Sequence, residues 1–307
     1  MQTALISHPV CQKHAGNSGH PECPERLRVF EQQLRSSAVV ADLKAHLAPI
    51  ADRHQLERVH DVDYIRTVEE ASPKQGLISL DPDTLMNPYS LESTKRGAGA
   101  ACLGAELVFR EEARHAFCAV RPCGHHATRN RAMGFCIFNG VAVGAAHALD
   151  DLGLARVAIL DFDVHHGNGT EDIFADDPRV LFCSSFQHPF YPYTDPVSHR
   201  DHIIKTPLAA GSGGDIFRKS VTDTWLPALE AFAPQMIFIS AGFDAHRDDQ
   251  LGQLQFVEDD YVWFTEKIIE VADRHCPGRI VSILEGGYDL QANAHSAIAH
   301  LQALADN

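Results

Sequence analysis

The chain has 307 residues, of which 45% are hydrophobic and 22% are charged. These fractions are close to globular averages, so they exclude an intrinsically disordered or fibrous protein. The net charge of -15 disfavours direct binding to nucleic acid or an anionic membrane and suits a cationic substrate, although acidity also serves solubility alone.

Short apolar runs rich in β-branched residues alternate with longer amphipathic stretches along the chain. This alternation is typical of a parallel sheet covered by helices on both faces. The predicted strands are Thr3 to Ile6, Ala116 to Val120, Arg156 to Leu160, Val180 to Cys183, Met236 to Ser240 and Ile280 to Leu284. The predicted helices are Pro24 to Ser36, Leu91 to Glu112, Asn139 to Asp150, Ile216 to Phe232 and Asp259 to His275, and Ile78 to Ser90 is expected to be a long loop.

No repeat, low-complexity segment or linker divides the chain, so we expect one α/β domain over residues 1–307. The N-terminus lacks a basic segment followed by an apolar core, and no apolar run is long enough to span a membrane. We therefore expect a soluble cytoplasmic protein, with oligomer formation left open. Because Cys118, Cys136 and Cys183 lie in apolar segments and no Cys-x-x-Cys pair occurs, most of the eight cysteines are expected to be reduced core residues.

Chemically reactive residues follow the predicted strands, where ligands of open parallel sheets bind. The clearest segment is DFDVHHGN, which begins at Asp161. In an extended chain Asp161, Asp163 and His165 point to one side and can present a carboxylate and an imidazole to one cation, as in a catalytic zinc site. Taken alone, an Asp-x-His segment more often caps a helix or stabilises a loop.

Three other strand ends favour the metal interpretation. His125 and His126 form a tandem pair, Asp244 and Asp249 offer further carboxylates, and Gly286-Gly287 permits a tight bend that directs Tyr288 inward. Each feature alone has an ordinary explanation as a turn or a solvated loop, but four such strand ends together predict a hydrolytic site.

The segments PCGHHA, GFCIFN, DFDVHHGNGTEDIF, SAGFD and LEGGYD, in this order, resemble the histone deacetylase and acetylpolyamine amidohydrolase family. HPECPERL and LDPDTLMNP are similar to its two rim loops, so the resemblance covers nearly the whole chain. It implies a single-domain, three-layer α/β/α fold of the arginase/deacetylase type, with a mainly parallel sheet of about eight strands.

The resemblance also implies the roles of individual residues. Asp163, His165 and Asp249 would bind a zinc ion, with ferrous iron as the alternative metal. His126 would act as general base beside His125, with Asp161 hydrogen-bonded to His125 and Asn168 beside His126. Tyr288 would polarise the substrate carbonyl. The implied substrate-binding residues are Gly134, Phe135, Tyr191, Phe256, His20 and Asp83.

Two further sets follow from the same resemblance. A structural potassium or sodium ion would be held by Asp161, Asp163, His165, Ser185 and Phe186, largely through carbonyl groups, and a second such site would lie near Phe174 to Val180. Arg26 is either an internal arginine beneath the metal or a surface residue at the start of a helix.

The sequence departs from the family pattern at three positions. Asn168 replaces a common Asp, as in the class II branch, and should leave His126 less basic because no charge stabilises its imidazolium. Tyr191 replaces a Phe. Asp248 replaces a Gly, which makes Asp248 the alternative to Asp249 as the third ligand.

The predicted function is hydrolysis of an acetyl or other short acyl group from an acyl-lysine side chain. Leu254 or Phe256 after Asp249, without an acidic residue there, favours an apolar-stemmed substrate over an acetylpolyamine, which is the alternative. A binuclear arginase-type hydrolase and a catalytically inactive binding protein are the remaining readings.

Overall fold

The computed structural model describes all residues 1–307 and contains one eight-stranded, wholly parallel sheet. The strands lie in the order β2-β1-β5-β10-β9-β6-β7-β8. Their bounds are β1 Thr3–Ser7, β2 Leu43–Leu47, β5 His115–Ala119, β6 Val157–Asp161, β7 Val180–Gln187, β8 Ile203–Leu208, β9 Ile237–Ala241 and β10 Ile280–Leu284. The predicted fold class is therefore confirmed, as are all six predicted strands.

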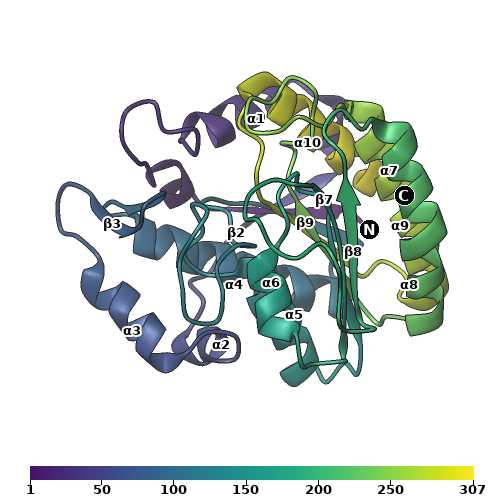
Figure 1. The fold of residues 1–307 in the computed structure, drawn as a ribbon, viewed down its shortest axis with the longest axis horizontal. Helices are drawn as coiled ribbons and strands as arrows, with labels where there is room; N and C mark the ends of the chain where they lie inside the picture. Colours follow the sequence, from purple (N-terminus) through teal and green to yellow (C-terminus); the bar gives the residue numbers. More distant parts are fainter.

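Helices cover both faces of this sheet (Figure 1). One layer contains α4 Ser90–Phe109 and α5 Gly140–Asp150, with α2 Arg53–Glu57 and α3 Val62–Ala71 outside it and α6 Asn168–Phe174 nearby. The other contains α1 Glu25–Arg35, α7 Gly214–Ser220, the π-helical turn η3 Val221–Trp225, α8 Leu226–Phe232, α9 Glu258–His275 and α10 Leu290–Ala305. Short 3-10 turns, η1 Pro9–Gln12 and η2 Ala38–Asp42, flank α1.

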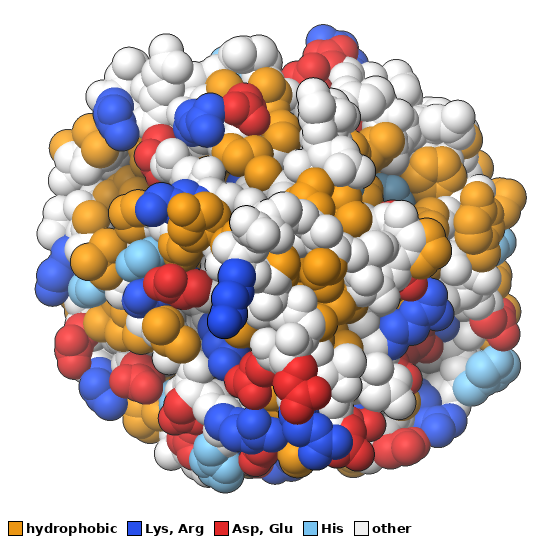
Figure 2. Space-filling view, turned by 90° about the vertical axis from the view of Figure 1, so that its left-hand side faces the viewer, with side chains coloured by type: hydrophobic (Ala, Val, Ile, Leu, Met, Phe, Trp, Pro, Cys, Tyr) orange, Lys and Arg blue, Asp and Glu red, His pale blue; other side chains and the backbone are white.

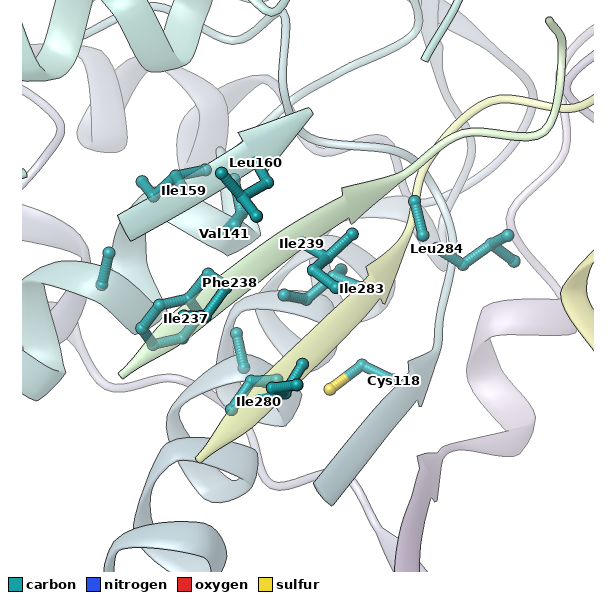
Figure 3. Packing of buried hydrophobic residues seen from close by; sticks show 14 of the residues in the cluster. Cys118, Val141, Ile159, Leu160, Ile237, Phe238, Ile239, Ile280, Ile283 and Leu284 are labelled. Carbon is teal, nitrogen blue, oxygen red and sulfur yellow. The ribbon is translucent and has the colours of Figure 1, made fainter. Parts of the chain in front are cut away.

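The central strands β5, β10, β9 and β6 are buried along their whole length, as expected for strands covered on both faces. Figure 3 shows Ile159, Phe238, Ile283 and their neighbours packed in this core. On α5, Gly144 permits close packing, because a Cβ atom there would lie 2.8 Å from Ala101 Cβ and 3.0 Å from Phe238 Cε1. A rigid sheet thus supports the loops at its carboxyl edge.

Several elements differ from the sequence-based expectation. The edge strands β2 and β8 and the C-terminal helix α10 were not predicted, and the predicted helix from Ile216 to Phe232 is divided into α7, η3 and α8. The expected loop from Ile78 to Ser90 contains a short antiparallel hairpin, β3 Ile78–Asp81 and β4 Thr84–Met86.

The cysteines are unpaired, as the sequence predicts, and the exposed side chains are of mixed type (Figure 2). All eight cysteines are free, and seven of them are buried. None of the helices is long and apolar enough to cross a membrane. On the face shown in Figure 2, acidic, basic and exposed hydrophobic side chains are interspersed.

Candidate metal and catalytic site

The polar side chains singled out in the sequence meet at the carboxyl edge of the sheet. His125 and His126 follow β5, Asp163 and His165 follow β6, Asp244 follows β9, and Tyr288 follows β10. Since β5, β10, β9 and β6 are adjacent in the sheet, their loops are neighbours although they are far apart in sequence.

Asp163, His165 and Asp244 form a cluster that could hold a metal ion, with one donor atom from each residue within 4.8 Å of the others. His165 Nδ1 lies 3.1 Å from Asp163 Oδ1 and 3.2 Å from Asp244 Oδ2. Asp244 is fully buried, yet its Oδ2 atom has no hydrogen-bond partner. A buried carboxylate oxygen without a hydrogen-bond partner is accounted for if it binds a cation. The two aspartates and one histidine are donors that suit zinc.

Electrostatics in the cluster support the same interpretation. Burial and the nearby Asp163 raise the pKa of Asp244 to about 7. Burial opposes a charge on His165, but the nearby carboxylates of Asp163 and Asp244 outweigh it and raise the pKa of His165 to about 10. The two buried carboxylates therefore favour a positive charge between them, which a bound cation would supply.

Asp249 does not belong to this cluster, and the prediction that it is the third ligand is wrong. Its Oδ1 accepts a hydrogen bond from the Leu251 amide at 2.8 Å. Its Oδ2 accepts from the amides of Tyr288 at 2.5 Å and Asp289 at 2.9 Å. Asp249 thus anchors the backbone that carries Tyr288, and Asp248, with a side chain 63% exposed, is not the ligand either.

The tandem histidines have the two hydrogen bonds that the resemblance implies. His125 Nδ1 lies 3.0 Å from Asp161 Oδ2, and His126 Nδ1 lies 2.7 Å from Asn168 Oδ1. The centroids of the two rings are 4.0 Å apart. Because the Asn168 oxygen can only accept a hydrogen bond, His126 Nδ1 must carry the proton. This leaves His126 Nε2 as a free proton acceptor.

The two histidines have opposite electrostatic surroundings. Burial disfavours charge on His125, but the carboxylates of Asp163 and Asp161 outweigh it and raise its pKa well above the usual value. For His126, burial and the positive charges of His125 and His165 lower the pKa well below the usual value. His126 is therefore the neutral imidazole of the pair.

Tyr288 is held from behind by Arg26. The Arg26 guanidinium lies 4.9 Å from the centre of the Tyr288 ring. Its Nε and Nη2 atoms donate to the carbonyls of Gly287 and Glu285, each at 2.5 Å. Gly287 has a φ of 120°, a conformation that glycine adopts readily. Arg26 is fully buried, so the reading of it as a surface residue is wrong.

A pocket of about 300 Å³ leads to this cluster. Its walls are mainly aromatic and consist of Asp83, His126, Gly134, Phe135, His165, Phe190, Tyr191, Tyr193, Gln250, Leu251 and Tyr288. Gly134 has a φ of 57°, and a Cβ atom there would lie 2.4 Å from His126 Cδ2. Only glycine therefore allows this wall to approach the His126 ring.

The rim residues fall into three groups. Gly134, Phe135, Tyr191 and Asp83 line the pocket as expected, and Asp83 Oδ1 accepts a hydrogen bond from the Gly134 amide at 3.0 Å. His20 is not among the lining residues, but the centroid of its ring lies 4.8 Å from that of Phe135, which is one of them. The prediction for Phe256 is wrong, because Phe256 is buried in the core with its ring 4.7 Å from that of Phe217.

Sequence reasoning missed four pocket residues, namely Phe190, Tyr193, Gln250 and Leu251. Phe190 stacks on the His165 ring at 5.5 Å between centroids. The available signal was position, since Phe190 directly precedes Tyr191, and Gln250 and Leu251 directly follow Asp249.

The comparison with protein families agrees with this site. Residues 20–304 match the model of the histone deacetylase domain. The chain belongs to the histone deacetylase family. Among relatives, a histone deacetylase-like amidohydrolase of Pseudomonas aeruginosa is 37% identical over 278 residues, covering 88% of this chain and 73% of that protein. A probable deacetylase of Archaeoglobus fulgidus is 34% identical, covering 95% and 82% respectively.

Some histone deacetylase relatives are much longer. A type-2 histone deacetylase 2 of Dictyostelium discoideum is 32% identical over the whole chain, which spans 21% of that protein. The fold also matches the crystal structure of the HDA15 HD domain, with a TM-score of 0.93, 31% identity and coverage of 100% of this chain and 89% of that one. Together these relatives support a hydrolytic enzyme of the deacetylase class.

Proposed function

We propose that this histone deacetylase family member is a zinc-dependent deacylase that removes an acetyl or other short acyl group from the side-chain amine of lysine in a peptide or protein. The observation that carries the proposal is the arrangement at the pocket floor. There, the free face of neutral His126, the Tyr288 side chain and the cluster of Asp163, His165 and Asp244 adjoin one aromatic pocket.

Asp163, His165 and Asp244 are the residues that would hold the metal, zinc in the first instance and ferrous iron as the alternative. A zinc ion there would polarise the acyl carbonyl and lower the pKa of a water molecule toward ~7. His165 would bind through Nδ1, the nitrogen that faces both carboxylates. A potassium or sodium ion held by carbonyls around Asp161, Ser185 and Phe186 remains part of the proposal.

His126 moves the proton. Its Nδ1 atom is held by Asn168, so Nε2 accepts the proton of the attacking water and afterwards returns it to the leaving amine. Asp161 fixes the neighbouring His125 by the 3.0 Å hydrogen bond. The positive charge on His125 disfavours a second charge next to it, so His126 starts each cycle neutral.

Tyr288 stabilises the oxyanion that develops on the carbonyl oxygen. Burial raises the pKa of Tyr288 well above its usual value, so the phenol keeps its proton and can donate it in a hydrogen bond. Arg26 beneath the ring and Asp249 at the backbone amide fix its position. A donor of this kind typically contributes ~3 kcal/mol to transition-state stabilisation.

The pocket walls favour an apolar stem. Phe135, Phe190 and Tyr191 suit the methylene chain of a lysine, and Asp83 is the single carboxylate among the lining residues. A polyamine carries further positive charges along its stem and would gain most from free carboxylates at the mouth. Acetylpolyamines and other small acyl-amines are therefore the second candidate class of substrate.

A binuclear arginase-type site is disfavoured by His166 and Asn168. His166 Nδ1 lies 2.9 Å from Ser184 Oγ, and its Nε2 lies 2.5 Å from Glu171 Oε2. Asn168 is uncharged and bonded to His126. Neither residue offers a free ligand for a second ion beside the first.

The test compares acyl-lysine peptides of increasing acyl length with acetylated polyamines on zinc-loaded protein. We expect a higher kcat/KM for the acyl-lysine peptides, and a preference for the polyamines would reverse the order of the two substrate classes. His126→Ala and Tyr288→Phe serve as controls. If both variants keep full activity, the proposed chemistry is wrong, whichever substrate is preferred.

A further inference from the structure

A second group of potential metal donors lies behind the pocket wall, outside the chemistry described above. It consists of Cys123, Cys136 and Glu285, and one donor atom from each lies within 4.8 Å of the others. All three side chains are buried, with exposed fractions of 2%, 0% and 1%. They come from the loop after β5, the segment after Phe135 and the end of β10.

Glu285 has one oxygen that is held and one that is free. Its Oε2 accepts hydrogen bonds from the amides of Gly124 at 2.6 Å and His125 at 3.1 Å. Its Oε1 is buried and has no hydrogen-bond partner. Because a buried carboxylate oxygen without a partner is costly, this atom points to a ligand.

The two thiols offer the soft part of the donor set. Cys136 Sγ lies 3.3 Å from Cys123 Sγ and 3.3 Å from the carbonyl oxygen of Gly134. Cys123 Sγ lies 3.7 Å from the same carbonyl. Two sulfurs, one carboxylate oxygen and one carbonyl oxygen therefore converge. These four donors are the number that a tetrahedrally coordinated ion takes.

We propose that Cys123, Cys136 and Glu285 form a second metal site, selective for a thiophilic divalent cation such as Zn²⁺ or Cd²⁺. Binding replaces the two thiol protons, which leave to solvent, by bonds from both sulfurs to the ion. With metal–sulfur bonds of ~2.3 Å, tetrahedral geometry places the sulfurs roughly 3.8 Å apart. The sulfurs thus need to separate by only about 0.5 Å.

Occupancy of this site would act on the catalytic loops. Glu285 holds the His125 amide, and Cys123 lies two residues before His125. Gly134 packs directly against the His126 ring. An ion that pushes the two sulfurs apart and binds the free oxygen of Glu285 would shift the loops that carry both histidines, so excess thiophilic metal is expected to lower kcat.

Cadmium distinguishes this site from the Asp163 cluster, which contains no sulfur. Fully reduced protein is titrated with Cd²⁺ while bound metal per chain and the ultraviolet thiolate-to-cadmium absorption are measured. We expect two bound ions per chain and a charge-transfer band that appears with only one of them. Cys123→Ser and Cys136→Ser should each lose the band and one equivalent of Cd²⁺.

Two matched controls test the assignment. Cys23→Ser removes the cysteine that is not fully buried, and Cys102→Ser removes a buried cysteine of the core, and both should keep the band. Circular dichroism shows that each variant is folded, and Cys136→Ala provides a second substitution if Cys136→Ser is not. A single bound ion without a band, or a band that survives in folded Cys123→Ser and Cys136→Ala, would overturn the proposal.

Discussion

Replacing Asp244 by Asn should abolish tight metal binding at the proposed zinc site. The change keeps the shape of the side chain but removes the negative charge of a fully buried group whose Oδ2 faces His165 Nδ1 at 3.2 Å and has no other partner. Substitutions of residues that merely orient metal ligands cost about 10–100-fold in affinity. Loss of a charged ligand should lower the affinity for zinc by more than ~100-fold, which corresponds to roughly 3 kcal/mol of binding free energy.

Asp249→Asn is the matched comparison, since it makes the same chemical change five positions along the chain. Asp249 accepts hydrogen bonds from the amides of Leu251, Tyr288 and Asp289, and hydrogen bonds to a charged group contribute about 1.5–3 kcal/mol each. We therefore expect Asp249→Asn to lower the melting temperature and kcat, because Tyr288 is less firmly placed, while zinc stays bound.

The assay measures zinc per chain after dialysis of zinc-loaded protein, together with kcat/KM and the melting temperature. Zinc should be lost from Asp244→Asn and kept by Asp249→Asn. The opposite pattern, with zinc kept by Asp244→Asn and lost from Asp249→Asn, would refute the ligand assignment and restore Asp249.

Three further predictions concern the proton-transfer residues and the pocket wall. Tyr288→Phe removes the oxyanion donor and should lower kcat by ~10²–10³-fold at unchanged zinc content, as measured by steady-state kinetics; unchanged kcat would contradict its role. Asn168→Asp places a carboxylate beside His126 Nδ1, which raises the pKa of His126 and so moves the acidic limb of kcat/KM to higher pH by ~1 unit or more; an unshifted limb would argue against His126 as the base. Phe256→Ala should cost about 3–5 kcal/mol in the free energy of unfolding because it empties core space, whereas Tyr191→Phe should alter substrate preference at unchanged stability, and denaturant titration with substrate kinetics separates the two.

Strands buried on both faces could be predicted from the sequence, and strands at the edges could not. The six predicted strands are apolar runs, because both of their faces pack on helices. By contrast, β2 is largely exposed on the edge of the sheet, so it lacks such a run. On the opposite edge, β8 contains Pro207, which breaks the pattern of a central strand but is tolerated at an edge.

Site residues could be predicted where a strand fixes their position. Asp163, His165 and Tyr288 lie two to four residues after a strand end, where the strand still constrains their position, and His125 follows β5 on a short loop. Asp249 lies farther from β9, on a loop that folds back so that its carboxylate accepts hydrogen bonds from the backbone amides of Tyr288 and Asp289. Spacing along the chain cannot show such a return, whereas Asp244 follows β9 almost directly.

The same limit applies to apolar residues near the site. An apolar residue on a loop after a strand can form a pocket wall or join the core, and its sequence neighbours are similar in both cases. Phe256 turns inward onto Phe217, while Phe190 turns toward His165. Only the three-dimensional course of the loops separates the two.

The two adjacent histidines have different groups behind their rings, a carboxylate for His125 and an amide for His126. His125 faces Asp161 and Asp163, and their negative charges hold its proton. His126 has an amide where a carboxylate would make its surroundings equivalent, so burial and the charge on His125 keep it deprotonated at Nε2. A base must be free of its proton when the water arrives, and here that condition is met by the contrast between an Asp and an Asn behind adjacent rings. We therefore expect His126, which has an amide behind its ring, to be the histidine that accepts the proton.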